Sequence, residues 1–102
     1  MLKIFISQPM NGLTDEEIKV RREDAIEKLK KHFEEEIEII DSFFEKAPHD
    51  AKPLWFLGKS LELLSTADCA LFLDGWNSAR GCRIENSCAV EYCIPDIYEN
   101  EI

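Results

Sequence analysis

The chain is poor in basic residues, and it contains no long apolar run. Lys and Arg together number 12 against 21 Asp and Glu, which gives a formal net charge of −9 at pH 7. Duplex nucleic acid and anionic membranes bind to basic surfaces, so this balance argues against both as partners. No segment approaches the roughly 20 apolar residues of a membrane-spanning helix. A small phosphorylated ligand stays compatible with the charge, because it needs only local donors such as a helix N-terminus.

Metal-binding motifs are also missing from the sequence. The cysteines form no Cys-x-x-Cys pair and fit no common zinc spacing. They are Cys69, Cys82, Cys88 and Cys93. We therefore expect buried free thiols in a cytoplasmic protein that holds neither a metal nor a cofactor. The opening residues Met1–Ser7 are too short for a signal peptide and lack a cleavage site, so they predict a strand.

Apolar patterning predicts alternating strands and helices within a single domain, residues 1–102. Thr14 and Glu17 form a capping box at the start of the first helix. The predicted strands are 2–7, 37–41, 68–74 and 94–98, and the predicted helices are 14–32, a segment carrying Leu54, Leu57, Leu61 and Leu64, and 81–93. This order predicts an α/β fold of the flavodoxin or Rossmann type. It would be a three-layer sandwich around a four-stranded parallel sheet, with a fifth strand left open.

A parallel sheet of this type binds ligands beyond the carboxyl ends of its strands, where the strand order reverses. With the order 2-1-3-4, that point lies between the first and third strands. The loops 8–13 and 75–81 converge there, and both are rich in polar and turn-forming residues. The two loops therefore predict the position of a ligand site.

Glu85 is a carboxylate on the apolar side of the third predicted helix. At roughly 100° per residue, the same arc also carries Cys82, Cys88, Ala89 and Tyr92. A buried carboxylate is costly unless something compensates it, and partly buried carboxylates near loops commonly serve catalysis. Two other interpretations stay open. Glu85 could pair with Arg80 or Arg83 at the helix start, and Cys82 could be a nucleophile if the helix N-terminus lowers its pKa.

The segment from the third strand into this helix resembles a known enzyme superfamily. Its motifs are similar to those of the nucleoside 2-deoxyribosyltransferases, a superfamily that includes deoxynucleoside monophosphate N-glycosidases. These motifs are, in order, Ala67-Asp68, an apolar strand, Asp74-Gly75 and Gly81-x-x-x-Glu85-x-x-x-Ala89. Short bacterial and phage proteins of unassigned function share the opening Phe5–Gly12 as well as the Asp74-Gly75-Trp76 stretch. The resemblance spans nearly the whole chain.

The resemblance implies that Glu85 is a covalent nucleophile. In the characterised members the matching glutamate attacks the anomeric carbon of a deoxyribosyl group and displaces the base. The sugar then passes to water or to another base, as in retaining glycosidases. The implied activity is cleavage or transfer at the N-glycosidic bond of a 2′-deoxynucleoside or its monophosphate.

Two acids of the transferases have no counterpart in this chain. One is an aspartate well upstream of the nucleophile, at a place that falls near Ser60, and the other lies shortly before it, where Ala79 stands. The monophosphate hydrolases carry a serine near that second place, and Ser78 is its neighbour here. The missing acids keep a nucleotide hydrolase open, and also a non-catalytic protein that binds a nucleotide or nucleotide-derived signal in the same cleft.

The loop after the third strand supplies further candidates. Asp74 could donate a proton to the leaving base or bind a sugar hydroxyl, although Asp-Gly is also a common turn pair. Trp76 could stack on a base or serve ordinary packing. Ser78, Arg80 and Gly81 could cradle a phosphate at the helix start, or Arg80 could be solvated.

The last predictions concern the first loop and the oligomeric state. Ser7, Gln8 and Met10 are expected as substrate contacts from their cleft position and the family match, with simple turn chemistry as the alternative. A chain of 102 residues leaves little material to roof a site. Related proteins form oligomers in which a neighbour contributes to the pocket. We therefore expect a homodimer or a higher homo-oligomer whose partner molecule is a small nucleoside or nucleotide.

Overall fold

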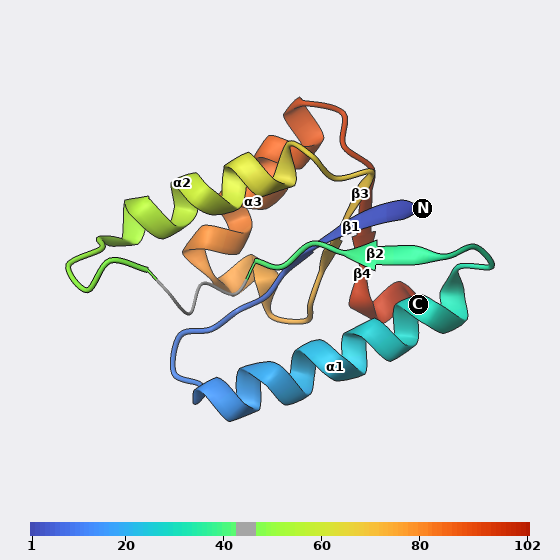
Figure 1. Ribbon diagram of the computed structural model, residues 1–102, viewed down its shortest axis with the longest axis horizontal. Coiled ribbons are helices and arrows are strands. Elements are labelled where there is room, and N and C mark those ends of the chain that lie inside the picture. The colour runs from blue at the N-terminus through green and yellow to red at the C-terminus, as the bar shows by residue number, and fades with distance from the viewer. Residues whose placement is uncertain (43–46) are drawn as a thin grey trace.

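Four parallel strands form the sheet at the centre of the molecule, in the order β2-β1-β3-β4 (Figure 1). The structure is a computed structural model that describes residues 1–42 and 47–102. The strands are β1 (Leu2–Ser7), β2 (Ile37–Ile39), β3 (Cys69–Phe72) and β4 (Asp96–Tyr98). The α-helices are α1 (Asp15–His32), α2 (Pro53–Leu64) and α3 (Arg80–Glu91), and short 3-10 helices lie at η1 (Trp76–Ser78) and η2 (Glu99–Glu101). The predicted α/β fold and strand order are confirmed.

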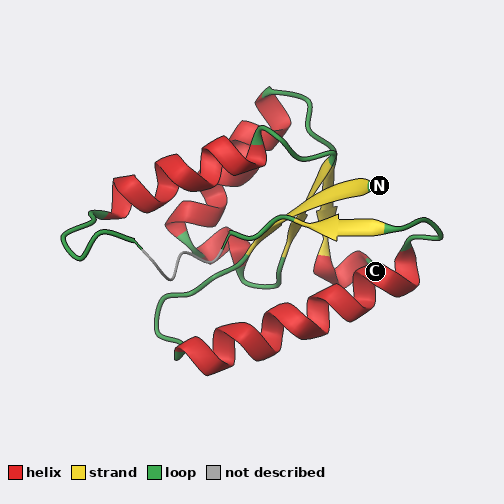
Figure 2. Ribbon diagram, viewed as in Figure 1, coloured by secondary structure: helices red, strands yellow, loops and turns green. Residues whose placement is uncertain are grey.

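The helices cover both faces of the sheet, which gives the expected three layers (Figure 2). Side chains alternate across a strand, so Ile4 and Ile6 face α1 while Phe5 faces α2 and α3. The α1 layer buries Ala25 and Leu29 against the sheet. The second layer buries Leu64 of α2 and Ala89 of α3. Because Ser7 lies two residues after Phe5, its side chain points to the same layer as α3.

Local sequence signals explain where α1 begins and ends. Thr14 and Glu17 form the predicted capping box, with Thr14 Oγ1 accepting from Glu17 N and Glu17 Oε1 accepting from Thr14 N, both at 3.1 Å. Acidic residues fill the first turn and basic residues the last, as the helix dipole favours. The described helices are all too short or too polar to cross a membrane.

Three strands are shorter than the sequence predicted. Residues just beyond the strand ends still make isolated backbone hydrogen bonds to a neighbouring strand. The apolar segments that predicted these strands are therefore longer than the regularly paired part. Ile40 N donates to Ile4 O at 2.9 Å, Asp68 N to Lys3 O at 2.8 Å, and Leu73 N to Ser7 O at 3.0 Å. The polar stretch expected before α2 is described only from residue 47, because 43–46 lie outside the described residues.

The end of α3 also differs from the prediction. The helix stops at Glu91 rather than at Cys93, and Tyr92, expected on the buried arc, is 79% exposed. Cys93 takes a left-handed conformation with φ of 59° where a glycine is usual, and Ile94 N donates back to Ala89 O at 2.8 Å. This turn points Tyr92 into solvent. Leu54, expected on the apolar side of α2, is likewise 76% exposed in the first turn of that helix.

Candidate functional site

Glu85 and Ser7 meet between α3 and the carboxyl end of β1. Glu85 is 8% exposed, and its Oε1 accepts a hydrogen bond of 2.6 Å from Ser7 Oγ, which is itself buried. Ser7 is the last residue of β1, and its backbone pairs with β3 next to the loop that leads to α3. The carboxylate therefore lies at the carboxyl ends of β1 and β3, the position at which folds of this type bind ligands.

Burial controls the protonation of Glu85. Loss of solvent raises the pKa of the carboxyl above its ordinary value, while hydrogen bonding from Ser7 and Ser60 lowers it. Ser60 lies on α2, so two hydroxyls from different elements act on one carboxylate. The described residues hold no ion pair between Glu85 and Arg80 or Arg83, both of which are exposed. Neutral hydroxyl groups, rather than a cation, offset the loss of solvation of the Glu85 carboxylate. This suits a nucleophile, because an ion pair with a cation would reduce its reactivity.

Cys82 does not have the properties of a thiolate nucleophile. It lies one turn before Glu85 and is 4% exposed. Burial raises the pKa of Cys82 to about 11, the hydrogen bond with Ser7 lowers it, and the charge of Glu85 raises it further. The thiol therefore stays protonated at neutral pH. Desolvation outweighs the helix N-terminus that could have activated it.

The two predicted loops do converge at these strand ends. Gly75 has φ of +92°, and a Cβ placed on it would lie 3.6 Å from Cγ of Pro9 in the first loop. The left-handed conformation favours glycine at this position. Leu73 N, just before the second loop, donates to Ser7 O at 3.0 Å. The loops that follow β1 and β3 are thus in direct contact beside the Glu85–Ser7 pair.

Asp74 lies at the end of β3, and charged side chains hold its backbone on both sides. Its carboxylate side chain is exposed. Asp74 N donates to Glu99 Oε1 at 2.9 Å, and Asp74 O accepts from Arg21 Nη2 at 2.9 Å. Glu99 in turn receives Lys28 Nζ on its other oxygen, Oε2, at 3.1 Å. The sequence interpretation missed Arg21, Lys28 and Glu99. A signal for Glu99 existed, because it directly follows β4 and so lies at the same edge of the parallel sheet as Asp74.

Trp76 is half-buried and packs within the protein. Its ring centroid lies 5.7 Å from that of Phe72 and 5.5 Å from that of Tyr98. Phe72 and Tyr98 also stack on each other, with centroids 5.8 Å apart. These contacts favour the packing interpretation of Trp76 over base stacking.

The start of α3 leaves backbone donors exposed. Ser78, Arg80 and Gly81 are all exposed, and the N-cap residue Ala79 offers no side-chain hydrogen bond to the helix. A Cβ at Gly81 would meet nothing within 4 Å, so the surface there is open. The first amides of a helix without a capping side chain are available to an anion.

Gln8 and Met10 occupy the first loop in different ways. Gln8 is 6% exposed and its Nε2 donates to Ile18 O of α1 at 2.6 Å. Its Oε1 is buried and has no hydrogen-bond partner among the described residues. Met10 is 38% exposed, and its carbonyl accepts from Leu13 N at 3.1 Å, which closes a turn. Gln8 therefore anchors the loop to α1, whereas Met10 remains on the surface.

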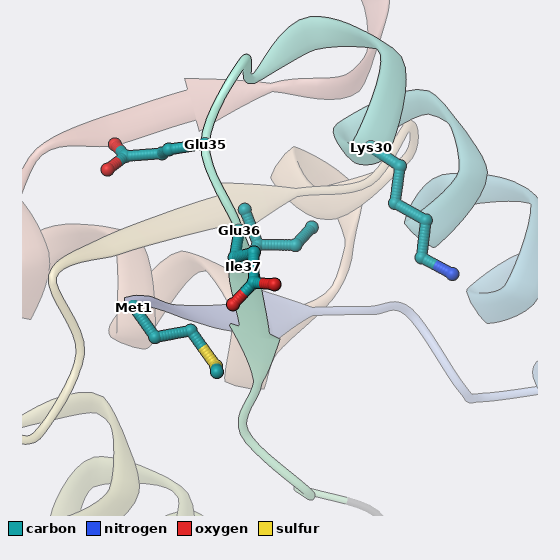
Figure 3. A pocket seen from close by; sticks show the side chains of 5 residues that line it. All are labelled: Met1, Lys30, Glu35, Glu36 and Ile37. Atoms are coloured by element: carbon teal, nitrogen blue, oxygen red, sulfur yellow. The ribbon is translucent and has the colours of Figure 1, made fainter.

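A separate hollow lies at the other end of the sheet. It measures ≈ 410 Å³ and is lined by Met1, Lys30, Glu35, Glu36 and Ile37 (Figure 3). Met1 precedes β1 and Ile37 begins β2, so the hollow lies at the amino ends of the strands. None of the predicted site residues lines it, and it is remote from Glu85.

Comparison with known proteins adds no assignment to this geometry. No family model, curated protein or solved structure matches the chain. Among the described residues, no group of three or more His, Cys, Asp or Glu side chains could hold a metal ion. The functional argument therefore depends on the crevice itself and on the residues that resemble the deoxyribosyltransferases.

Proposed function

We propose that the protein cleaves the N-glycosidic bond of a 2′-deoxynucleoside or its monophosphate, or transfers the deoxyribosyl group, with Glu85 as covalent nucleophile. One observation supports this most strongly. Glu85 is buried, accepts a hydrogen bond of 2.6 Å from Ser7 Oγ, and lies by the carboxyl ends of β1 and β3. A carboxylate in this setting is weakly solvated and oriented, which are the requirements for attack on an anomeric carbon.

The reaction proceeds in two steps. The Glu85 carboxylate bonds to the anomeric carbon as the bond from that carbon to the base nitrogen breaks. The base leaves with a proton, for which the exposed Asp74 carboxyl at the end of β3 is the proposed donor. Water, or a second base, then attacks the same carbon and releases the sugar from Glu85. The proton lost by the attacking water, or by the nitrogen of the attacking base, returns to Asp74, so the enzyme ends in its starting state.

Most of the other predicted site residues are proposed to contact the substrate around its anomeric carbon. Ser78, Arg80 and Gly81, at the open start of α3, are proposed to bind a 5′-phosphate through hydroxyl, guanidinium and amide donors. Met10, which is exposed in the first loop, is proposed to contact the sugar or base, whereas Gln8 is proposed to hold that loop in place and Trp76 to pack beneath the site.

Base release from a panel of deoxynucleosides and their monophosphates tests the proposal. We expect the wild type to release base, measured by chromatography, and Glu85→Gln to release none. Glu91→Gln is the matched control, because Glu91 is an exposed acid on the same helix. Equal release by the wild type and Glu85→Gln would refute Glu85 as nucleophile.

A non-catalytic nucleotide-binding function is the second candidate. It is favoured by Ser60, which acts on Glu85 as a hydroxyl near the place where the transferases carry an acid. Ala79, at the start of α3, likewise offers no acid. Tight binding of a nucleotide without base release, in both the wild type and Glu85→Gln, would establish this function in place of catalysis.

We further propose a cytoplasmic homodimer or higher homo-oligomer. The four cysteines are free, which fits a reducing compartment, although only Cys69 and Cys82 are buried as expected, while Cys88 is half-buried and Cys93 is exposed. A chain of 102 residues has few segments to cover the crevice, so a neighbouring copy is proposed to complete it. Light scattering at micromolar concentration should give at least twice the mass of one chain, and a monomeric mass would contradict this.

A further inference from the structure

Two charged side chains hold the backbone at Asp74, and a third is bonded to one of them; we call Arg21, Lys28 and Glu99 the Asp74 clamp. Glu99 Oε1 accepts from Asp74 N, and Arg21 donates to Asp74 O, each at 2.9 Å. The peptide groups before and after Asp74 are thus both held by side chains that can carry charge. Charge-assisted hydrogen bonds are stronger than neutral ones, so the clamp restricts rotation of both peptides.

The clamp joins three elements that are distant in the sequence. Arg21 and Lys28 project from α1, Asp74 ends the β3 segment, and Glu99 begins η2. Glu99 is 8% exposed, and both of its oxygens are used, by Asp74 N and by Lys28 Nζ. Hydrogen bonding to Glu99 raises the pKa of Lys28, which keeps its ammonium group charged. A buried carboxylate is expensive without such a partner.

Such a network is better suited to fixing geometry than to adding stability. An ion pair that is partly removed from solvent gains little over well-packed apolar side chains, because desolvation offsets the attraction. An apolar contact could have secured η2 to α1 at lower cost, as Ile102 does by packing in the α1 layer. The ionic groups of the clamp are instead directed at the two backbone atoms of one residue.

That residue begins the turn that leads from β3 towards α3. Gly75 follows with φ of +92°, a Cβ on it would lie 3.6 Å from Cγ of Pro9, and α3 begins at Arg80 shortly after η1. A rotation at Asp74 would therefore move the Asp74 carboxyl and the open start of α3 together. Misplacement of a reacting group by about 1 Å can cost on the order of 100-fold in rate.

We infer that Arg21, Lys28 and Glu99 are positioning residues that hold the Asp74 carboxyl for proton donation to the leaving base. This inference depends on the proposed function, because it gives the clamp a role in that reaction. Arg21 and Glu99 contact only the backbone of Asp74 at the site, while Lys28 contacts Glu99 and, at 3.5 Å, Asp24. They are therefore not catalytic residues themselves.

Amide hydrogen exchange by NMR and base-release kinetics, measured on the same variants, test the inference. In Glu99→Ala we expect the Asp74 amide to exchange at least about tenfold faster. We expect kcat to fall by about 10- to 100-fold, with KM changed much less. Glu99→Gln should restore most of both, since its side-chain oxygen can still accept from Asp74 N. Glu101→Ala, at an exposed acid of the same turn, is the control and should match the wild type.

The outcomes separate the clamp from the proposed function. An active wild type with an equally active Glu99→Ala would overturn the positioning role and leave the proposed function intact. An Asp74 amide that exchanges no faster in Glu99→Ala than in Glu101→Ala would overturn the clamp itself. A wild type that releases no base from any substrate would overturn the proposed function, and the positioning role with it.

Discussion

At the scale of single residues, the site depends on how Glu85 is desolvated and then partly compensated. Burial raises its pKa, and hydrogen bonds from Ser7 and Ser60 act in the opposite direction. Ser7 therefore has two effects: it orients one oxygen of the carboxylate and it favours the ionised form. A nucleophile needs that form, so these hydroxyls set the lowest pH at which the reaction would proceed.

Ser7→Ala should shift the acid side of the pH–rate profile. Loss of the hydrogen bond from Ser7 Oγ removes a contribution that lowers the pKa of Glu85. The Glu85 pKa then rises, and the acid limb of kcat/KM moves to higher pH. Ser87→Ala, at an exposed serine of α3, is the control and should leave the profile unchanged. An acid limb at the same pH in Ser7→Ala would show that this hydrogen bond does not tune the nucleophile.

Glu85→Gln should stabilise the fold at neutral pH. The folded-state pKa of Glu85 is raised above its ordinary value of 4.5, so its contribution to stability is present below about pH 4.5 and is lost as pH rises through the folded pKa. Gln keeps the acceptor for Ser7 but cannot ionise. We expect equal stability of the two proteins at low pH and a gain of roughly 0.5–2 kcal/mol for the variant at pH 7.5. Urea unfolding at both pH values measures this, and a less stable variant at pH 7.5 would contradict the cause assigned to the pKa shift.

At the scale of elements, the start of α3 lacks a stabilising cap, and the same lack leaves its amides available to a ligand. Ala79 occupies the N-cap with an extended backbone, φ −104° and ψ 123°, but contributes no side-chain hydrogen bond. Thr14, whose backbone is also extended, supports a full capping box on α1. The contrast indicates that the amides of α3 are left open rather than satisfied internally.

Ala79→Ser should therefore have opposite effects on stability and binding. A capping serine is worth about 0.5–2 kcal/mol, so the urea midpoint should rise. The same hydroxyl would occupy an amide that the proposal assigns to a 5′-phosphate. Calorimetric titration should then show weaker binding of a deoxynucleoside monophosphate, with binding of the matching nucleoside unchanged. Equal loss for both ligands would show that the start of α3 does not recognise the phosphate.

The elements themselves could be predicted well from local patterns, and their ends less well. A nearly continuous apolar run gives β1 with its observed bounds, helical apolar periodicity gives α1, and the capping box gives the start of α1. The 3-10 helix η1 was not predicted, because its contacts with Phe72 and Tyr98 join residues from different strands. Tyr92 was misplaced because helical periodicity alone does not show where the helix ends. The left-handed Cys93 has no sequence signal comparable with glycine.

At the scale of the whole molecule, topology connects the sequence to the site. The β2-β1-β3-β4 order follows from the alternation of strands and helices, and it places the β1 and β3 loops together. This is why Ser7, Glu85 and Asp74 could be selected before the fold was known. Glu99 was missed although its place directly after β4 was a signal, whereas Arg21 and Lys28 could not be selected, because their contacts with Asp74 and Glu99 are long-range and no local pattern encodes them.

The central claim is that Glu85 forms a covalent bond to the sugar. A deoxynucleoside analogue with fluorine on the sugar carbon next to the anomeric carbon destabilises the oxocarbenium-like transition state, and a good leaving base lets the first step outrun the second. Intact-mass spectrometry followed by peptide mapping should find the fluorinated sugar on the peptide that carries Glu85, and no adduct on Glu85→Gln. Base release by the wild type with Glu85 unmodified would contradict the account.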